Sequence, residues 1–483
     1  MGTGLRDKKV LVMGLGMFGG GVFSARWLLS QGAHVTITDL KNKLELAGSL
    51  KKIKGLNKVT LVLGEHRADD FMKNDIIVVG PAVPRESDFL KIAKRNKKQL
   101  ENDASLFFRF IDRPVIAVTG TRGKTTTTNY IAQLLSEKYG TIIPCGNTPA
   151  NPLLREFGKR GSKKRPVVAE LSSWQLEFLP SARRCPSIAV ITNLYPDHLN
   201  RHKNMEDYAR AKANIFRYQK KDDFLILNYD NSWTRFFLSR KPKSLCYFFS
   251  RKKLPLTLNG IYCDGGTLVY RSNGVERILV DMKNFERERG GHNVDNLMAA
   301  VLAATLLDSG MVVTPRMLRE LKEVPLRQET VFHNEKIIVI NDSAATSPDA
   351  VVQAIKRFRL QNIALITGGT DKNLDFAPLA REIKKYIPVA RLILLAGSAT
   401  DRLVQKLHAI KYFTATRKPK RFETLKECFN EALRAVDGKK GIIIFSPGAA
   451  SFEKFKNEFD RGAKFNRLVK RKKVATKSRL RKN

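Results

Sequence analysis

The sequence has few of the residues that build disulfides, metal clusters or membrane spans. Its five cysteines are scattered and odd in number, without a C-x-x-C pair, so we expect reduced structural thiols and neither a zinc site nor a redox site. No apolar run approaches the roughly 20 residues that cross a bilayer. The start, "MGTGLRDKKVLVMGLG", leads directly into a strand-like segment and lacks the parts of a secretory signal. We therefore expect a cytoplasmic protein without a membrane span.

Acidic residues are also scarce, since 87 Lys and Arg stand against 46 Asp and Glu and give a formal net charge of +41. The basic residues are spread along the chain, in "KNKKQL" near 96, in "KRGSKKR" near 159 and in the segment from Lys470 to Asn483. No Cys/His finger, aromatic RNA-binding signature or basic heptad region accompanies them. A basic nucleic-acid-binding ATPase stays an alternative, but we expect no nucleic-acid partner, and the charge also suits phosphate-rich substrates.

Apolar strand-like runs alternate with amphipathic helical stretches throughout the chain, which is the βαβ pattern of mainly parallel sheets. The strand-like runs fall into three groups, at residues 8–80, 114–229 with shorter β-like pieces to about 280, and 336–448. We expect an α/β protein with domains at 1–112, 113–325 and 326–469, and a frayed basic tail at 470–483.

The first Gly-rich turn is Gly14-x-Gly16-x-x-Gly19, between a strand-like and a helix-like segment, with Asp39 at the end of the next strand. Such glycines let backbone N–H groups approach a diphosphate at a helix N-terminus. NAD and any other nucleoside diphosphate are both candidates, and a tight turn without a ligand is the third reading.

The second Gly-rich turn lies in "PVIAVTGTRGKTTTTNYIAQLL", Pro114 to Leu135. It is a shortened phosphate-binding loop, because Val118 stands where the usual G-x-x-x-x-G-K-[ST] pattern has its first glycine. Backbone N–H groups from Gly120 to Thr126 would cradle ATP phosphates, Lys124 would reach the β and γ oxygens, and the Thr125 hydroxyl would bind Mg²⁺.

Further candidates follow neighbouring strand-like segments. Glu170 ends the strand of "VVAELSSWQLE", His198 follows the strand of "ITNLYPDHL", and Lys212 lies on an expected helix with Tyr208 one turn before it. A carboxylate at the carboxyl end of a parallel strand is suited to a hard cation. Taken alone, Glu170 could be a solvated loop residue, His198 a structural residue and Lys212 a surface residue. Their combination with the phosphate-binding loop favours an active site.

The chain resembles the Mur ligase family of ATP-dependent amide-bond ligases over roughly residues 8 to 468. The resemblance rests on Gly14-Leu15-Gly16, the shortened loop, Gly146-Asn147, "ELSSWQLE", Asp197-His198, "YARAK", "GGHNVDN", "INDSAAT", "GGTDKNLDF" and "SPGAASFEKFKNEFDRGAKF". "ELSSWQLE" and the last run are most similar to the members that add D-glutamate to UDP-N-acetylmuramoyl-L-alanine in peptidoglycan precursor synthesis.

The resemblance implies a Rossmann-like N-terminal domain for the UDP-linked substrate, a central P-loop-type ATPase domain with a mainly parallel sheet, and a Rossmann-like C-terminal domain for the amino acid. It also implies a cytoplasmic enzyme, expected to be a monomer, that uses ATP and two Mg²⁺ ions. The residues that it assigns to the UDP-linked substrate are Gly14, Gly16, Met17, Phe18, Asp39 and Asn147. For ATP they are Gly120, Thr121, Arg122, Gly123, Lys124, Thr125, Thr126, Asn293, Arg327 and Asp342; for the amino acid they are Thr346, Lys372 and Ser451. Lys124, His198 and Lys212 are the implied catalytic residues, and Thr125, Glu170, His198 and Lys212, the last as a carbamate formed with CO₂, are the implied metal ligands.

The sequence departs from the family at three places. Ala344 stands where a Lys is usual, Leu326 replaces a His before Arg327, and Gly80-Pro81-Ala82 replaces a Ser-Pro-Gly turn. The missing Lys leaves a different incoming amino acid as an alternative. An NAD-dependent oxidoreductase would leave the second nucleotide loop unexplained, and a folylpolyglutamate-type ligase would lack a UDP-binding first domain.

Overall fold

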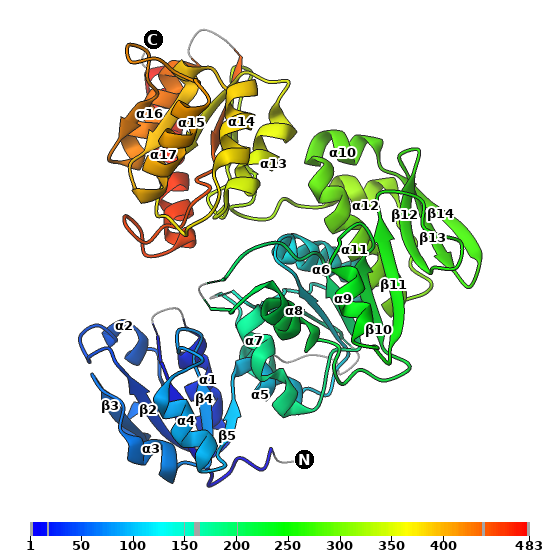
Figure 1. Ribbon diagram of the computed structural model, residues 1–483, viewed down its shortest axis with the longest axis vertical. Helices are drawn as coiled ribbons and strands as arrows, with labels where there is room; N and C mark the ends of the chain where they lie inside the picture. The colour runs from blue at the N-terminus through cyan, green and yellow to red at the C-terminus, as the bar shows by residue number, and fades with distance from the viewer. Residues whose placement is uncertain are drawn as a thin grey trace. The chain divides into compact units, whose positions relative to one another are not determined.

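A computed structural model describes residues 3–16, 19–148, 150–158, 165–199, 201–436 and 440–480. The chain forms α/β structure around three sheets, which follow one another in the colours of Figure 1. It divides into two compact units, one of residues 1–283 with 293–319 and the other of residues 284–292 with 320–483. Among the described residues, no helix is long and apolar enough to cross a membrane.

The N-terminal sheet is five-stranded and parallel, in the order β3-β2-β1-β4-β5. Its inner strands bury both faces, because the side chains alternate between two apolar clusters, with Val10 and Val12 packed towards α1 and Leu11 and Met13 towards α3 and α4. Its elements are β1 (Lys9–Met13), α1 (Gly20–Ser30), β2 (His34–Asp39), α2 (Ala47–Leu50), η1 (Leu56–Lys58), β3 (Val59–Leu63), α3 (Ala68–Lys73), β4 (Ile76–Val79), α4 (Asp88–Arg95), β5 (Gln99–Glu101) and α5 (Asp103–Phe110).

The central sheet is nine-stranded, in the order β14-β13-β12-β11-β10-β9-β6-β8-β7. The strands from β12 to β7 pair in parallel, whereas β12, β13 and β14 form an antiparallel meander. The elements are β6 (Val115–Thr119), α6 (Lys124–Tyr139), β7 (Cys145–Gly146), η2 (Leu153–Gly158), β8 (Val167–Glu170), α7 (Ser173–Phe178), η3 (Leu179–Ala182), β9 (Ile188–Ile191), α8 (Met205–Ala213), β10 (Phe224–Asn228), α9 (Thr234–Ser239), β11 (Leu245–Ser250), β12 (Gly260–Asp264), β13 (Thr267–Ser272), β14 (Val275–Asp281), α10 (Lys283–Arg289), α11 (Gly291–Leu307) and α12 (Pro315–Glu320).

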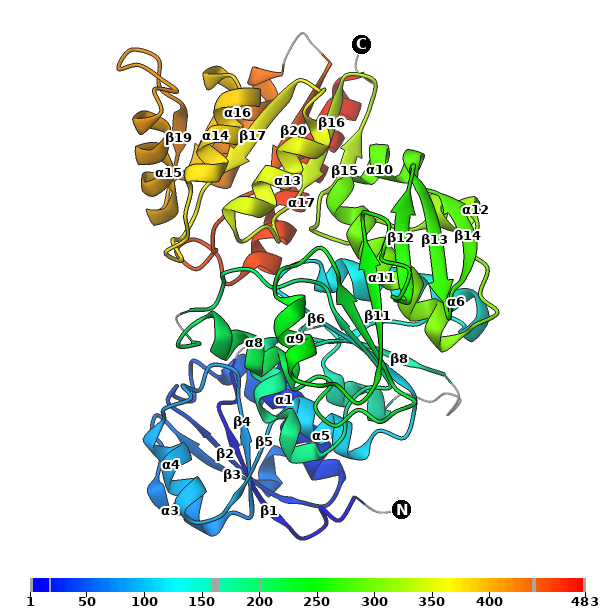
Figure 2. The ribbon, with the colours of Figure 1, turned by 45° about the vertical axis from the view of Figure 1, so that its right-hand side comes forward.

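The C-terminal sheet is six-stranded, in the order β15-β16-β20-β17-β18-β19, and only its edge strand β15 is antiparallel. Figure 2 shows its strands between the helices, and the core clusters place α13, α14 and α15 on one face and α16 and α17 on the other. The elements are β15 (Glu329–His333), β16 (Ile337–Asn341), α13 (Pro348–Phe358), β17 (Ile363–Thr367), α14 (Ala377–Tyr386), η4 (Val389–Arg391), β18 (Leu392–Leu395), α15 (Ser398–Ala409), β19 (Lys420–Phe422), α16 (Leu425–Ala435), β20 (Gly441–Phe445) and α17 (Glu458–Leu480).

The predicted α/β class with mainly parallel sheets is confirmed. The expected boundaries at 112/113 and 325/326 fall in connections, between α5 and β6 and between α12 and β15, and they stay predictions. The expected tail at 470–483 stays a prediction. The helix α17 extends to Leu480, over a segment from Ala463 that contains neither Gly nor Pro and is rich in Lys, Arg, Leu and Ala, which favour helix. Residues 481–483 lie outside the described residues.

Candidate active site

The shortened phosphate-binding loop joins β6 to α6 and is held from outside by the residues that follow β9. Asn193 accepts hydrogen bonds from the backbone N–H of Thr121 at 3.0 Å and, through Oδ1, from that of Arg122 at 2.9 Å. Gly120 has a φ of 148° and Gly123 a φ of 80°, a region that favours glycine. A β-carbon on Gly120 would lie 1.9 Å from Thr192 Oγ1. Glycine is therefore required for both the backbone angle and the close approach.

Lys212 lies on α8 and is buried directly beneath this loop. Its Nζ donates to the Gly120 carbonyl oxygen at 3.0 Å and contacts Thr119 Oγ1 at 3.3 Å, while the side chain is 1% exposed. Nζ also lies 4.6 Å from the centre of the Tyr208 ring. Burial, followed by the charge of Lys124, lowers the pKa of Lys212 well below the ordinary value of a lysine, although Asp197 and Glu170 oppose the shift. A buried lysine with this tendency to lose its proton is rare outside functional sites.

Glu170 ends β8, which pairs in parallel with β6, so its carboxylate lies at the same edge of the sheet as the loop. It is 6% exposed, and its Oε1 accepts a hydrogen bond from Asn147 Nδ2 at 3.2 Å. His198 has a positive φ of 55°, and its ring lies 6.0 Å from that of Tyr208 and 3.6 Å from an Asp197 oxygen. The structure thus groups Glu170, Asn147 and Lys212 around the loop, with His198 beside Tyr208.

The donor set fits a hard cation only in part. The Glu170 carboxylate and the Thr125 hydroxyl, at the start of α6, are oxygen ligands of the kind that Mg²⁺ prefers. Among the described residues, no three His, Cys, Asp or Glu side chains are arranged to hold a metal ion. An ammonium on Lys212 would repel a cation, but burial lowers the pKa of Lys212 and favours the neutral amine.

Asn296 and Asn193 contact the loop, and neither was assigned a role from the sequence, whereas Asn293 was assigned to ATP. A β-carbon on Gly123 would lie 2.1 Å from Asn296 Oδ1, and Asn296 Nδ2 donates to Asn293 Oδ1 at 3.1 Å. The signal was present in "GGHNVDN", where the i, i+3 spacing puts the two amides on one face of α11. Asn193 could also have been predicted, because it follows the carboxyl end of β9, at the same edge of the sheet where Glu170 ends β8.

The Gly14 turn of the N-terminal domain is closed by its own side chains. Gly14 and Gly16 both have positive φ, 84° and 64°. Asp39 Oδ2 accepts the Gly16 N–H at 3.1 Å and Oδ1 accepts the Lys41 N–H at 2.9 Å. Asp39 is therefore a support of the turn, and only its remaining lone pairs face other partners. Met17 and Phe18 lie outside the described residues.

In the C-terminal domain, Asp342 and Arg327 lie near the carboxyl end of β16. Asp342 is buried, and it accepts hydrogen bonds from Ser446 Oγ at 2.6 Å and from the Gln328 N–H at 3.1 Å. Burial raises the pKa of Asp342 to about 7, against the hydrogen bond from Ser446 and the charge of Arg327. Arg327 donates to the Ala344 carbonyl oxygen at 3.1 Å, so this guanidinium contacts the backbone of the residue that stands in place of the expected Lys.

The three residues predicted to bind the amino acid differ in their surroundings. Ser451 is 3% exposed and lies in the turn after β20, Thr346 is half-buried after β16, and Lys372 is exposed. The buried guanidinium of Arg461 donates to the carbonyl oxygens of Ala449 and Ala450 at 3.0 Å each and to that of Ser343 at 2.8 Å. It thereby ties the turn before Ser451 to the end of β16.

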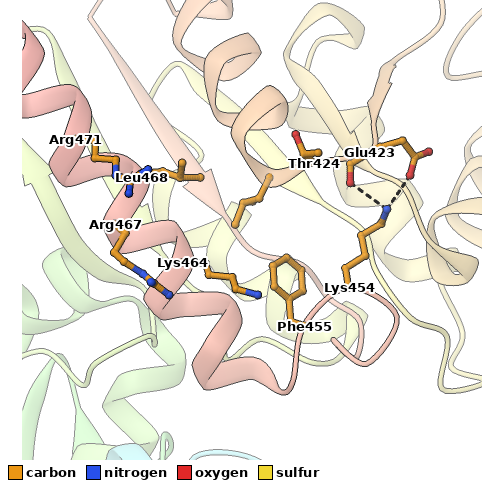
Figure 3. A pocket seen from close by; sticks show the side chains of 9 residues that line it. Glu423, Thr424, Lys454, Phe455, Lys464, Arg467, Leu468 and Arg471 are labelled. Carbon is orange, nitrogen blue, oxygen red and sulfur yellow. Dashed lines mark hydrogen bonds and ion pairs between the residues drawn. The ribbon is translucent and has the colours of Figure 1, made fainter.

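The same domain contains a pocket of about 500 Å³ beside α16 and α17, shown in Figure 3. Phe455, Leu425 and Leu468 form its apolar wall, and Lys464, Arg467 and Arg471 of α17 form its basic rim. Lys454 is paired with Glu423 at 2.7 Å. None of the site residues predicted from the sequence lines this pocket, so it is distinct from the candidate active site.

Comparison with known proteins agrees with this geometry. The family model described as the Mur ligase middle domain matches residues 118–304, and the model described as the Mur ligase MurD-like N-terminal domain matches residues 8–100. A UDP-N-acetylmuramoylalanine–D-glutamate ligase of Roseiflexus sp. (strain RS-1) is 37% identical over 469 residues, covering 96% of this chain and 99% of that protein. The ligase of the same name from Borreliella afzelii (strain PKo) is 35% identical over 471 residues, covering 96% and 98%.

Solved structures share the fold at lower identity. The UDP-N-acetylmuramate–alanine ligase of Thermotoga maritima has a TM-score of 0.54 at 20% identity, covering 97% of this chain and 99% of that chain. The MurF ligase of the same organism, solved in complex with ADP, has a TM-score of 0.57 at 16% identity, covering 98% and 97%. With relatives above 30% identity over nearly the whole length of both proteins, this chain belongs to the Mur ligase family.

Proposed function

We propose that this protein is an ATP-dependent ligase that joins D-glutamate to UDP-N-acetylmuramoyl-L-alanine in peptidoglycan precursor synthesis. The observation that carries the proposal is the burial of Lys212 under the Gly120–Gly123 loop, next to Lys124 and Glu170, in a chain whose full-length relatives carry that activity in their names. Because ATP and nucleotide-linked precursors are cytoplasmic metabolites, we also propose a cytoplasmic enzyme. We propose a monomer, since one chain supplies all the predicted binding residues.

The first half-reaction activates a carboxylate. The substrate carboxylate attacks the γ-phosphorus of ATP and forms an acyl phosphate, with ADP as the leaving group. Both reactants are anions, so positioning and charge neutralisation supply most of the rate. Lys124, at the first position of α6, would bind the β and γ oxygens, and the Gly120–Thr126 backbone would hold the phosphates. Asn293, Arg327 and Asp342 are the further residues proposed for ATP.

When bound, Mg²⁺ would supply positive charge that offsets the charge of the phosphates. The Thr125 hydroxyl and the Glu170 carboxylate would hold it, with His198 at a second ion. We propose that Lys212 completes the second site after its neutral amine has added to CO₂ and released one proton. The lowered pKa of Lys212 favours the neutral amine, and the resulting carbamate is an anion that attracts the cation.

The second half-reaction joins the amine of the amino acid to the acyl carbon, and phosphate leaves. Ser451, Thr346 and Lys372 would bind the two carboxylates of D-glutamate. The Gly14–Gly16 turn, with Asp39, Met17, Phe18 and, from the central domain, Asn147, would bind the UDP-linked substrate. A glycine turn at a helix start suits a diphosphate, and the preference for UDP over NAD rests on the MurD-like N-terminal domain and on the names of the relatives.

The test is phosphate release from ATP with UDP-N-acetylmuramoyl-L-alanine and a panel of amino acids. We expect turnover only when the UDP-linked substrate and D-glutamate are both present. Equal or faster turnover with another amino acid would reject the D-glutamate assignment, and Ala344 makes that comparison informative. Size-exclusion chromatography with light scattering checks the monomer.

The carbamate has its own test. We expect Lys212→Ala to lose at least about a hundredfold in kcat, since it removes a cation ligand, and to be restored in part by formate or acetate. Chloride at equal ionic strength should not restore it. The matched control is Lys221→Ala, an exposed lysine, which should retain full activity. An unimpaired Lys212→Ala variant would exclude the carbamate.

A further inference from the structure

A cluster of five charged or titratable residues lies between the loop after β4 and the helices α7 and α8. Its members are Arg85, Glu177, Arg201, His202 and Asp207. The two arginines balance the two carboxylates. We call this set the charge cluster; it joins the N-terminal domain to the central domain within one compact unit.

Arg85 is the contribution of the N-terminal domain. Its NH1 donates to Asp207 Oδ2 at 2.6 Å, and its Nε lies 3.8 Å from Glu177 Oε2. The Glu177 side chain is 8% exposed and that of Asp207 is 22% exposed. The Arg85 side chain is 35% exposed, so these pairs are only partly shielded from water, on the side of the two carboxylates.

Arg201 approaches the same loop from the central domain. It binds Glu177 with two parallel hydrogen bonds, of 3.0 Å from Nε and 2.9 Å from NH2. Its remaining NH1 donates to the carbonyl oxygens of Pro81 and Val83, at 3.2 and 3.3 Å. One guanidinium therefore fixes both a helix of the central domain and the backbone of the N-terminal loop, which a lysine could not do.

His202 fills the interior of the charge cluster. Its side chain is fully buried and its Nε2 lies 3.0 Å from Ser173 Oγ, at the start of α7. Its Nδ1 lies 3.5 Å from Asp207 Oδ2, and its ring packs 4.9 Å from the ring of Tyr208. The imidazole therefore holds α7 and α8 together behind the two arginines.

The charge cluster connects the two ends of the proposed active site. On one side, Gly80 N donates to Met13 O at 2.8 Å, and a β-carbon on Gly14 would lie 3.6 Å from Val83 Cγ2, so the loop that Arg201 holds packs on the Gly14 turn. On the other side, Asp207 and Lys212 share α8.

Arg201 also lies close in sequence to a predicted metal ligand. The backbone N–H of Arg201 donates to the carbonyl oxygen of His198 at 3.0 Å, as does that of His202. A displacement of Arg201 would therefore also displace the backbone of His198, which is hydrogen-bonded to it.

We propose that Arg85 and Arg201 are positioning residues for the ligation reaction, which set the distance between the nucleotide-linked substrate on the Gly14 turn and the γ-phosphate above Lys212. The inference rests on the proposed function for its kinetic consequence. Neither arginine contacts the reacting atoms in the proposed mechanism. Their effect passes through the 80–85 loop and through α8.

The first variants are Arg85→Asp, which puts a third carboxylate beside Asp207 and Glu177, and Arg201→Lys, which keeps the charge but loses the two-pronged geometry. We expect each to lower kcat/KM for the UDP-linked substrate at least about tenfold, because a displacement of about 1 Å costs that much or more. The affinity for ATP, measured with a fluorescent ADP analogue, should change less than about twofold, since the loop at Gly120 is untouched. Arg95→Ala, an exposed arginine of the same domain, is the matched control and should match the unaltered enzyme.

The swapped pair Arg85→Asp/Asp207→Arg tests the contact itself. We expect it to regain a large part of the kcat/KM lost in Arg85→Asp, as coupled charges do in double-mutant cycles. If the swapped variant is as slow as Arg85→Asp, the Arg85–Asp207 pair is not the cause and the role of Arg85 is overturned. An unchanged substrate KM and kcat in Arg201→Lys, or an equal loss of ADP affinity, overturns the role of Arg201.

Hydrogen exchange separates this inference from the proposed function. Amides of residues 82–87 should exchange faster in Arg85→Asp and Arg201→Lys than in the unaltered protein, whether or not the chain uses D-glutamate. If the unaltered protein releases no phosphate with this substrate pair, the proposed function fails, and unchanged exchange in both variants would overturn the interdomain contact independently.

Discussion

Gly123→Ala is the substitution whose cost follows most directly from the structure. Gly123 has a left-handed φ of 80°, which costs a residue with a β-carbon about 1 kcal/mol. The added carbon would also lie 2.1 Å from Asn296 Oδ1, well inside van der Waals contact. The Asn296 amide must then move and break its 3.1 Å hydrogen bond to Asn293, at a further cost of about 1–1.5 kcal/mol. We expect a total destabilisation of about 2–2.5 kcal/mol.

Part of the destabilisation of Gly123→Ala should come from its contact with Asn296. Asn296→Ala alone loses the hydrogen bond to Asn293 and should cost about 1 kcal/mol. In Gly123→Ala/Asn296→Ala the clash is gone and only the backbone strain and the lost hydrogen bond remain, so we expect about 2 kcal/mol instead of the sum of the single values. Thermal unfolding of the four proteins measures the cycle, at roughly 2 °C for each kcal/mol in a unit of this size.

Binding of ADP with Mg²⁺, measured by calorimetry, provides the functional readout. Gly123→Ala should weaken it at least about tenfold, because the loop can no longer present its N–H groups to the phosphates. Additive unfolding temperatures in the cycle, together with unchanged ADP affinity in Gly123→Ala, would refute the contact between the loop and α11.

Three more predictions follow from single features. Burial raises the pKa of Asp103 to about 6, against a hydrogen bond from Gln175. Between about pH 4 and pH 6 the folded state therefore holds a proton that the unfolded state has lost, so the free energy of unfolding falls as the pH rises through this range. In denaturant titrations, Asp103→Asn should be more stable by up to about 3 kcal/mol at pH 7 and little changed at pH 4. The N-terminal domain should bind UDP and not NAD, which calorimetry with competition would contradict if NAD bound at micromolar strength. Removal of residues 472–483 should leave turnover unchanged at fixed salt, since the buried Phe465 and Val469 of α17 lie before the cut, and a loss of turnover would show that the domain extends further.

The sheets were accessible from the sequence because each buried parallel strand is a short apolar run between turn residues. "VLVM", "VIAVT" and "IIIF" have this form in the three domains, and β1, β6 and β20 occupy them. The weak strands were less accessible. β14 carries mostly exposed residues and β19 has three residues, so neither has the apolar content that identifies a strand; partners on the neighbouring strands determine them.

The sequence predicted those site residues whose chemical role follows from the residue type and the neighbouring motif. Lys124 and Thr125 follow a Gly-rich turn, and Glu170 ends a strand; the structure brings them to one edge of the central sheet. The burial of Lys212 could not be predicted, because "YARAK" has the sequence context of a solvent-exposed helix, whereas the Lys212 side chain is 1% exposed. Asn296 and Arg201 were missed for the same reason, since their partners are 169 and 24 residues away.

The surroundings of Lys212 link its chemistry to the loop above it. A neutral amine has two N–H donors and one lone pair, and Nζ contacts two oxygens, Gly120 O at 3.0 Å and Thr119 Oγ1 at 3.3 Å. The lone pair is then the group that attacks CO₂, and one of the two N–H protons is released when the carbamate forms. A carbamate nitrogen retains a single N–H, so it can donate to only one of the two oxygens. The Thr119 hydroxyl already donates its one proton to the Leu171 carbonyl oxygen at 2.9 Å, so it would have to give up that bond to donate to the new anion. The Gly120 carbonyl oxygen can only accept a hydrogen bond. The proposed carbamate is therefore compatible with the observed loop if its N–H keeps the Gly120 contact, and in that arrangement the modified side chain fixes the carbonyl at the start of the phosphate-binding loop.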